Sequence, residues 1–205
     1  MGIYAKYVFP HFMDWSMGTR RFQHQRREAL SLLRGEVLEI GFGTGLNLPH
    51  YPAAVSRVTA LEPARLLPEK VAGRIAAASM PAELVYGSAE RLPFGDRRFD
   101  CVASTWTLCT IPDAVAALQE VRRVLKPGGR FAFLEHGRSN APPIARWQDR
   151  LNPLQQRIGV GSNMNRAIDR LITEAGLTLD RLDRFQMPGI PRLVGEMYRG
   201  IASAH

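Results

Sequence analysis

Three glycines on alternate positions carry the first chemical signal in the sequence. Gly41, Gly43 and Gly45 directly follow the apolar run Val37–Ile40, which predicts a buried strand. Glycine permits positive φ angles and lets a ligand approach the backbone closely. A buried strand that leads into a glycine-rich turn and then a helix is typical of a nucleotide-binding corner in a doubly wound sheet. The turn is therefore a candidate binding site, with purely structural glycines as the alternative.

Leu46 and the acids around the turn indicate which kind of nucleotide would fit. The dinucleotide fingerprint G-x-G-x-x-G/A requires glycine or alanine where this chain has Leu46, which favours a nucleoside without a pyrophosphate. Glu62 lies about twenty residues past the first glycines and is placed to accept hydrogen bonds from both ribose hydroxyls. A surface or capping role is its alternative. Glu39 could accept from a ligand ammonium group or could brace the turn.

Alternating strands and helices must position these residues. Short apolar stretches predict further strands over 57–61, 83–86, 99–104 and 130–134, with helices over 66–78 and 113–125. The sequence KPGG at 126–129 is expected to end the second helix. Alternation of this kind predicts a parallel sheet. Residues 177–185 and 193–202 could add two strands that pair antiparallel.

Composition and charge narrow the class of protein. The chain has 205 residues, with 45% hydrophobic and 22% charged residues, which is ordinary for one globular domain. Its two cysteines, Cys101 and Cys109, predict a reduced, cytoplasmic protein rather than a disulfide scaffold. No stretch approaches the roughly 18 apolar residues of a membrane-spanning helix.

The net charge of +8 is unevenly distributed along the chain. Residues 35–137 are neutral, whereas residues 1–34 hold six basic and two acidic residues and residues 138–205 hold ten and six. Basic ends can attract an anionic membrane or nucleic acid, and a solvated surface is the alternative. Because the chain has neither zinc-finger spacing nor a long Lys/Arg block, nucleic acid is not expected as a partner. Peripheral contact with an anionic membrane stays open.

Five motifs together resemble the class I S-adenosylmethionine-dependent methyltransferases. EIGFGTG, LEP, GSAERLPF, FDCVASTWTL and VLKPGGRF occur in that family's order and spacing between about residues 36 and 135. The resemblance implies a Rossmann-like, mostly parallel seven-stranded sheet with an antiparallel C-terminal pair. It also implies S-adenosylmethionine as cofactor and S-adenosylhomocysteine as product. The family's cofactor-binding roles fall on Glu39, Gly41, Gly43, Gly45, Glu62, Ser88, Ala89, Glu90 and Thr105.

A narrower resemblance concerns the acceptor of the methyl group. TLC at 107–109, LEHG at 134–137, RWQDRLNPL at 146–154 and GSN at 161–163 resemble alkyl thiol S-methyltransferases, a branch close to quinone-biosynthesis C-methyltransferases. This implies a small lipophilic acceptor, with a thiol or sulfide first and phospholipid amines or quinones as the alternative. A non-catalytic cofactor-binding module is the alternative of another class. The chain departs from the branch at Ser162, where cysteine is expected, and in having no hydrophobic anchor at its start.

Methyl transfer from a sulfonium is an in-line displacement that needs alignment and no metal, and no His/Cys/Asp spacing suggests a metal site. A thiol attacks as its thiolate, so a base or a cationic neighbour helps. His136 follows the fifth strand and is the candidate base or orienting group, with a histidine hydrogen-bonded at the strand end as the alternative. The candidate pocket residues, with ordinary packing as their alternative, are Trp106, Cys109, Trp147 and Asn163.

The first 34 residues are set apart from the expected catalytic domain at 35–205. Tyr4, Val8, His11 or Phe12, and Trp15 share helical spacing, although Pro10 would break or restart the helix. The segment is expected to be a helical lid over the substrate pocket, with an interfacial membrane helix as the alternative.

Overall fold

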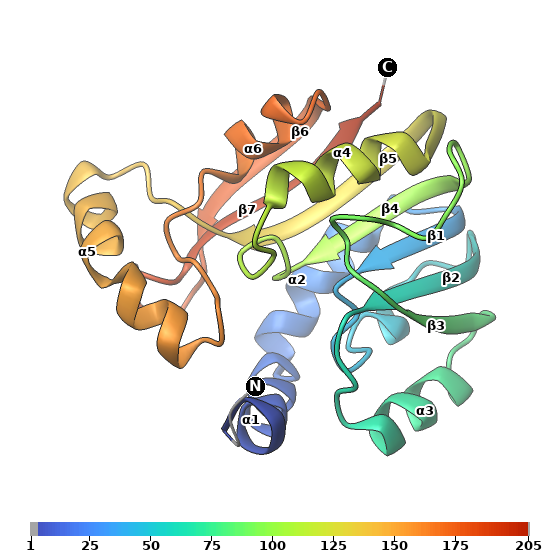
Figure 1. The fold of residues 1–205 in the computed structure, drawn as a ribbon, viewed down its shortest axis with the longest axis horizontal. Coiled ribbons are helices and arrows are strands. Elements are labelled where there is room, and N and C mark those ends of the chain that lie inside the picture. Colours follow the sequence, from blue (N-terminus) through green and yellow to red (C-terminus); the bar gives the residue numbers. More distant parts are fainter. Residues whose placement is uncertain (1–3, 205) are drawn as a thin grey trace.

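A seven-stranded, mostly parallel sheet forms the centre of the computed structural model, which describes residues 4–204 (Figure 1). The strand order is β3-β2-β1-β4-β5-β7-β6, and β7 pairs antiparallel with both of its neighbours. The expected fold class and the antiparallel C-terminal pair are therefore confirmed. The strands are β1 (Gly35–Ile40), β2 (Val55–Glu62), β3 (Ala82–Tyr86), β4 (Phe99–Thr105), β5 (Leu125–His136), β6 (Thr178–Gln186) and β7 (Glu196–Ser203).

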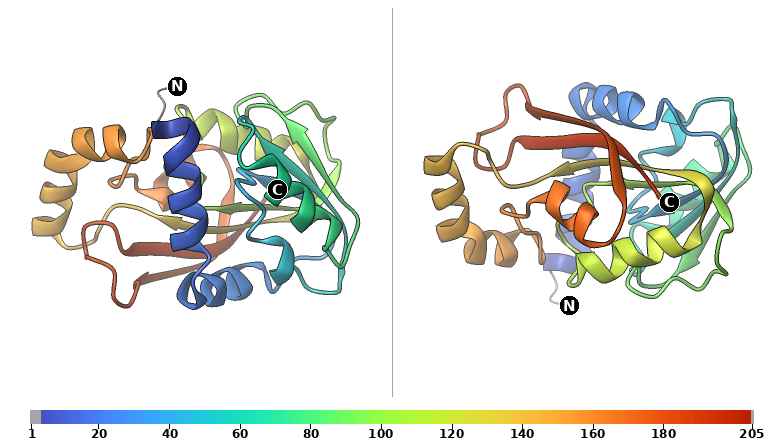
Figure 2. Two further views of the ribbon diagram at one scale, coloured as in Figure 1. Left: turned by 90° about the horizontal axis from the view of Figure 1, so that it is seen from below. Right: turned by 90° about the horizontal axis from the view of Figure 1, so that it is seen from above.

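Two apolar layers bury the two faces of the sheet. Successive strand residues point to opposite faces, so Val37 and Leu38 of β1 belong to different core clusters, and both are fully buried. Leu38 shares its layer with α4 (Ala114–Val124) and α6 (Ile168–Glu174), and Val37 shares its layer with α2 (Arg20–Leu30) and α3 (Pro68–Ala76). Figure 2 shows α2 and α4 on opposite sides of the sheet. Burial on both faces explains the apolar runs within the central strands.

The segment after the glycine turn contains no α-helix, unlike the usual strand–turn–helix corner. Only one 3-10 turn, η2 (Leu48–His50), separates the glycines from β2. Pro49 and Pro52 explain this, because proline donates no backbone hydrogen bond and disfavours a helical conformation in the residue before it. The two predicted helices are present as α3 and α4, and the Asp113 carboxylate caps α4 by accepting from the Ala116 N–H at 2.9 Å.

The KPGG sequence at 126–129 was expected to end the second helix, and α4 ends just before it, at Val124. The strand boundary differs more: β5 begins at Leu125 instead of residue 130 and runs through KPGG, with a register shift between the pairs Phe99–Leu125 and Cys101–Arg130. Gly128 adopts a φ of +74° inside this irregular stretch, which only glycine adopts readily. Two helices had no sequence prediction, α5 (Pro142–Ile158) and α6.

The N-terminal segment is helical, as expected. A short π-helix, η1 (Tyr4–Val8), continues into α1 (Phe9–Met17), and α2 follows after a short turn. Pro10 lies in the first turn of α1, where its missing N–H breaks no hydrogen bond, so it starts this helix. α1 crosses the side of the molecule between α5 and α3 (Figures 1 and 2). Among residues 4–204, no helix is long and apolar enough to span a bilayer.

Candidate cofactor and acceptor site

The three glycines after β1 have different structural roles. All three have positive φ, at +69° for Gly41, +60° for Gly43 and +83° for Gly45. A Cβ atom on Gly41 would lie 2.1 Å from the Thr107 side chain, and one on Gly45 would lie 2.9 Å from the Phe42 ring. A Cβ on Gly43 would meet no atom within 4 Å. Gly41 and Gly45 are therefore required by packing, whereas Gly43 leaves open space where a ligand could approach the backbone.

Glu62 lies at the end of β2 and contacts this open glycine. Its Oε2 accepts from the Gly43 N–H at 2.8 Å, and its Oε1 accepts from the Ala64 N–H at 3.2 Å. Burial raises the pKa of the Glu62 carboxyl, while the two backbone hydrogen bonds oppose that rise. Each carboxylate oxygen keeps a second lone pair. The carboxylate can therefore hold the turn and still accept from the hydroxyls of a ribose.

Glu39 braces the turn. Its carboxylate accepts from the Asn47 amide at 2.8 Å and from the Tyr51 hydroxyl at 2.6 Å, and the side chain is buried. Burial raises its pKa to about 7, against the effect of these hydrogen bonds. Both carboxylate oxygens are thus engaged by donors of the segment that follows β1, which matches the bracing alternative of the two considered for Glu39.

Arg26 of α2 reaches the same place and was missed from the sequence. Its guanidinium donates from Nη1 to the Asn47 amide oxygen and to the Thr105 hydroxyl, both at 2.8 Å, and lies 4.7 Å from the centroid of the Trp106 ring. Burial lowers its pKa to about 10, so it stays charged at neutral pH. Its Nε is buried without a hydrogen-bond partner among the described residues. A buried cation with an unpaired N–H is suited to an anionic group such as the carboxylate of an amino acid.

The loop after β4 is held by a second buried acid. Glu135 accepts from the Ser104 hydroxyl at 2.7 Å and from the backbone N–H groups of Thr107 and Leu108 at 2.9 and 3.1 Å. Burial raises its pKa to about 7. Trp106, within this loop, has a φ of +52°, an uncommon conformation for a bulky residue that persists only where the surroundings fix it. Glu135 supplies that constraint and has no free oxygen for a ligand ammonium.

His136, Cys109 and Ser162 form a buried group next to this loop, and the half-buried Asn163 adjoins it. The Ser162 hydroxyl lies 3.3 Å from His136 Nε2, and the Cys109 thiol donates to the Trp106 carbonyl at 3.6 Å. Asn163 donates from its backbone and its side chain to the Cys109 carbonyl at 2.9 and 3.0 Å. The structure therefore brings together three of the predicted acceptor-site residues, and Ser162 joins them.

Burial controls the titration of this group. It lowers the pKa of His136 to about 4 and, together with Glu135, raises the pKa of Cys109 to about 12. At neutral pH the imidazole is therefore neutral and the thiol is protonated. His136 Nδ1 is buried without a hydrogen-bond partner in the described part of the chain, so it is available to a ligand.

An apolar core cluster lies beside these polar groups, since Met197 of β7 pairs with His136 of β5. In it, Trp106 packs edge-on against Phe22 of α2, with ring centroids 5.3 Å apart. The other members of the cluster are Ala29, Leu134, Phe185, Met187, Ile190 and Met197. Leu134, Met187 and Met197 are almost fully buried, so the cluster makes the surroundings of His136 apolar on this side.

The predicted residues at 88–90 and Trp147 lie outside the group around His136. Glu90 accepts from the Ser88 hydroxyl at 2.9 Å and from the Asp113 N–H at 2.8 Å, and with buried Ala89 forms the turn that follows β3. Trp147 lies apart from the other candidates, since it is 54% exposed on α5 and stacks under the Arg150 guanidinium. The next residue, Gln148, occupies the buried side of the helix, which turns Trp147 outward.

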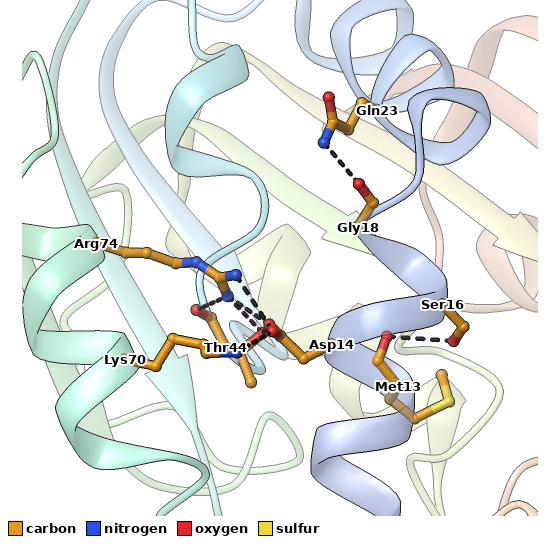
Figure 3. Close-up of polar contacts among 8 residues, drawn as sticks. All are labelled: Met13, Asp14, Ser16, Gly18, Gln23, Thr44, Lys70 and Arg74. Atoms are coloured by element: carbon orange, nitrogen blue, oxygen red, sulfur yellow. Dashed lines mark hydrogen bonds and ion pairs between the residues drawn. The ribbon is translucent and has the colours of Figure 1, made fainter.

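α1 is fastened to the glycine turn through Asp14 (Figure 3). Its carboxylate accepts from the Thr44 hydroxyl at 2.6 Å, from Lys70 at 2.7 Å and from Arg74 at 2.5 Å. Arg74 also donates to the Thr44 carbonyl at 2.8 Å. Burial disfavours the charged carboxylate, but these hydrogen bonds outweigh it and hold the pKa of Asp14 well below its usual range. Asp14 thus joins the N-terminal segment, the turn and α3.

Known proteins resemble the chain both in sequence and in fold. The model of the family described as "Methyltransferase domain" matches residues 38–133. The human thiol S-methyltransferase TMT1B is 29% identical over 202 residues, which cover 90% of this chain and 81% of that protein. The phosphatidylethanolamine N-methyltransferase of Cereibacter sphaeroides is 27% identical, covering 80% and 81%. A solved S-adenosylmethionine-dependent methyltransferase from Thermotoga maritima superimposes with a TM-score of 0.67 at 20% identity, covering 97% and 96%.

Proposed function

The chain is a class I S-adenosylmethionine-dependent methyltransferase, and we propose that it methylates a small lipophilic thiol or sulfide. When bound, the cofactor supplies an electrophilic methyl group on its sulfonium. The chain's own residues fit such a cofactor in three respects. Open space adjoins Gly43, the Glu62 carboxylate lies at its edge, and the unpaired Nε of Arg26 is buried nearby.

Each part of the cofactor has a candidate partner in the proposed site. Glu62 would accept from the ribose hydroxyls, Arg26 would meet the carboxylate of the methionine part, and Thr105 would form the adjoining wall. Ser88, Ala89 and Glu90 would flank the adenine. These roles extend the family resemblance to the arrangement of the side chains.

One observation favours an acceptor that is not an amine. Glu135, the carboxylate next to His136, is saturated by donors from Ser104, Thr107 and Leu108. A site for a charged ammonium headgroup needs a free carboxylate, whereas a thiol acceptor does not. The apolar core cluster with Met187 and Met197 adjoins His136 and would favour the hydrocarbon part of a lipophilic thiol over a charged headgroup.

His136 would act on the acceptor by orienting it. Its pKa of about 4 makes it a weak base, and taking a proton from a thiol of pKa about 8.5 would cost roughly 6 kcal/mol. The neutral imidazole can instead hold the acceptor by a hydrogen bond, while the thiol loses its proton to solvent. Of the two roles considered for His136, we therefore propose orientation.

A phospholipid amine is the second candidate, because the similarity to the phosphatidylethanolamine enzyme also covers four-fifths of both chains. An acceptor panel separates the two. Initial rates with labelled cofactor are measured for an alkanethiol, for phosphatidylethanolamine in mixed micelles and for a reduced quinone. Thiol turnover that exceeds the others supports the proposal, and methylation of the lipid amine alone would overturn it.

A further inference from the structure

The outer side of the N-terminal segment is apolar. Its inner side carries the buried residues Pro10, Asp14 and Met17. The exposed side carries Tyr4, Val8, Phe12 and Trp15, and the last is 73% exposed. Usually a surface helix turns its apolar stripe toward the core. Here large apolar side chains face outward and the ionic contacts of Asp14 face inward.

α5 carries a second exposed apolar stripe. Trp147, Leu154 and Ile158 are each more than half exposed, at spacings of seven and four residues that place them on one side of the helix. Ala145 and Gln148 occupy its buried side. Folding therefore leaves this stripe in water.

The two stripes adjoin one another. The Tyr4 hydroxyl donates to the Ile158 carbonyl at 3.4 Å, joining the start of η1 to the end of α5. The left view of Figure 2 shows the N-terminal helix beginning beside that end of α5. We call the combined surface the docking face and define it as Tyr4, Val8, Phe12, Trp15, Trp147, Leu154 and Ile158. Exposed large apolar side chains gathered on two adjoining helices mark an interaction site.

Positive charge flanks the docking face. Arg146, Arg150 and Arg157 are exposed on α5 and form no ion pair with any described residue. Asp149, the acidic residue of α5, is paired with Arg138 at 2.6 Å. The segments 1–34 and 138–205, which carry all residues of the docking face, each have a net charge of +4. A second copy of the chain would bring these arginines toward like charges, whereas anionic lipid headgroups would attract them.

We propose that the docking face binds the surface of an anionic lipid bilayer, with Trp15 and Trp147 inserted at the headgroup level. Amphipathic aromatic rings favour this depth, and exposed basic residues add electrostatic attraction. The inference goes beyond the proposed reaction, because membrane binding does not depend on which acceptor is methylated.

Vesicle flotation of the full chain tests the charge and the face separately. Phosphatidylcholine vesicles with phosphatidylglycerol should carry the protein at low salt, and vesicles without it should carry far less. The variant Arg146→Gln/Arg150→Gln/Arg157→Gln should weaken binding by about a hundredfold. The variant Trp147→Ser/Leu154→Ser/Ile158→Ser should weaken it by about tenfold or more. The control Leu32→Ser, at a side chain 48% exposed beyond α2, should bind as the wild type does.

Tryptophan fluorescence locates the contact, because the chain has three tryptophans and two lie on the docking face. Variants that keep only one tryptophan are mixed with vesicles containing brominated lipid. Trp15 alone and Trp147 alone should each be quenched, while Trp106 alone should keep its emission. Absence of vesicle binding, or quenching of Trp15 without Trp147, would overturn the proposal. A stable dimer in solution that dissociates when Trp147 is substituted would also overturn the proposal.

Discussion

The Asp14 carboxylate accepts a hydrogen bond from the Thr44 hydroxyl at 2.6 Å, which ties the N-terminal helix to the glycine turn. Lys70 and Arg74 complete the contact from α3 (Figure 3). A helix that could otherwise move as a unit is thereby fixed to the segment that would hold the cofactor. The first prediction follows from this link.

Asp14→Asn should lower the free energy of unfolding by about 2 kcal/mol at pH 7, because it leaves two cations without their anion. The folded-state pKa of Asp14 lies below its unfolded value, so this stabilisation is present above about pH 4 and is lost as the pH falls below it. Urea unfolding of both proteins at pH 7 and pH 3 measures the difference. The control Asp149→Asn removes an exposed pair and should cost less than about 1 kcal/mol. Equal losses for the two variants would contradict this account.

Gly43→Ala should weaken cofactor binding more than it weakens the fold. Gly43 has a positive φ and open space around its Cβ position, so alanine would add about 1 kcal/mol of backbone strain and also fill the space next to the ligand. Gly128→Ala is a matched control, since Gly128 has a similar φ and equally open space but lies in the KPGG stretch. Calorimetric titration with S-adenosylhomocysteine should show weaker binding for Gly43→Ala alone. If both variants bind like the wild type, Gly43 is not in contact with the cofactor.

Glu62→Gln should reduce cofactor affinity by about tenfold or more, because charged hydrogen bonds are worth about 1.5–3 kcal/mol. The amide also presents donors to the Gly43 N–H, which disturbs the turn. Affinity is measured by calorimetry after circular dichroism has shown that the variant is folded. Glu83→Gln, at an exposed acid of β3, provides the control. Unchanged affinity in folded Glu62→Gln would remove Glu62 from the site.

His136→Asn should lower thiol turnover by a factor that is the same at pH 7 and at pH 9. Burial keeps the pKa of His136 near 4, so the imidazole is neutral throughout this range and its orienting effect does not titrate. A pH–rate profile of both proteins measures the factor. A loss that shrinks as the pH approaches the thiol pKa would instead identify His136 as the base.

His136 should also affect how the stability of the protein depends on pH. Because the folded-state pKa of His136 is lower than its unfolded value, the wild type should lose stability as the pH falls from about 6.5 to about 4. That part of the loss should be absent from His136→Asn.

The sequence predicted the parallel strands well because they contain apolar runs, several of them bounded by glycine or proline. After Gly45, Pro49 and Pro52 leave only the short turn η2 where a nucleotide-binding corner usually has a helix. α5 had no prediction because its apolar residues face water rather than a core, so the usual pattern of burial is absent.

Sequence reasoning found the parts of the site that lie at strand ends, such as Glu62 and His136. It missed Arg26 because an arginine within a basic run looks like a solvated residue, and only tertiary contact with Asn47 and Thr105 reveals its burial. It placed Trp147 in the acceptor pocket, whereas the helix turns that side chain outward. In both cases the role depends on whether the side chain points toward the rest of the protein. Residue spacing along the chain does not determine that direction, because it depends on where the neighbouring elements pack.

Direct competition between acceptors tests the central claim. The enzyme is incubated with S-adenosylmethionine carrying a deuterated methyl group and an equimolar mixture of an alkanethiol, phosphatidylethanolamine and a reduced quinone, and the products are identified by mass spectrometry. We predict that the deuterated methyl group appears mainly as the methyl thioether and that Glu62→Gln reduces this product. Label in the lipid amine or the quinone, without thioether, would contradict the account.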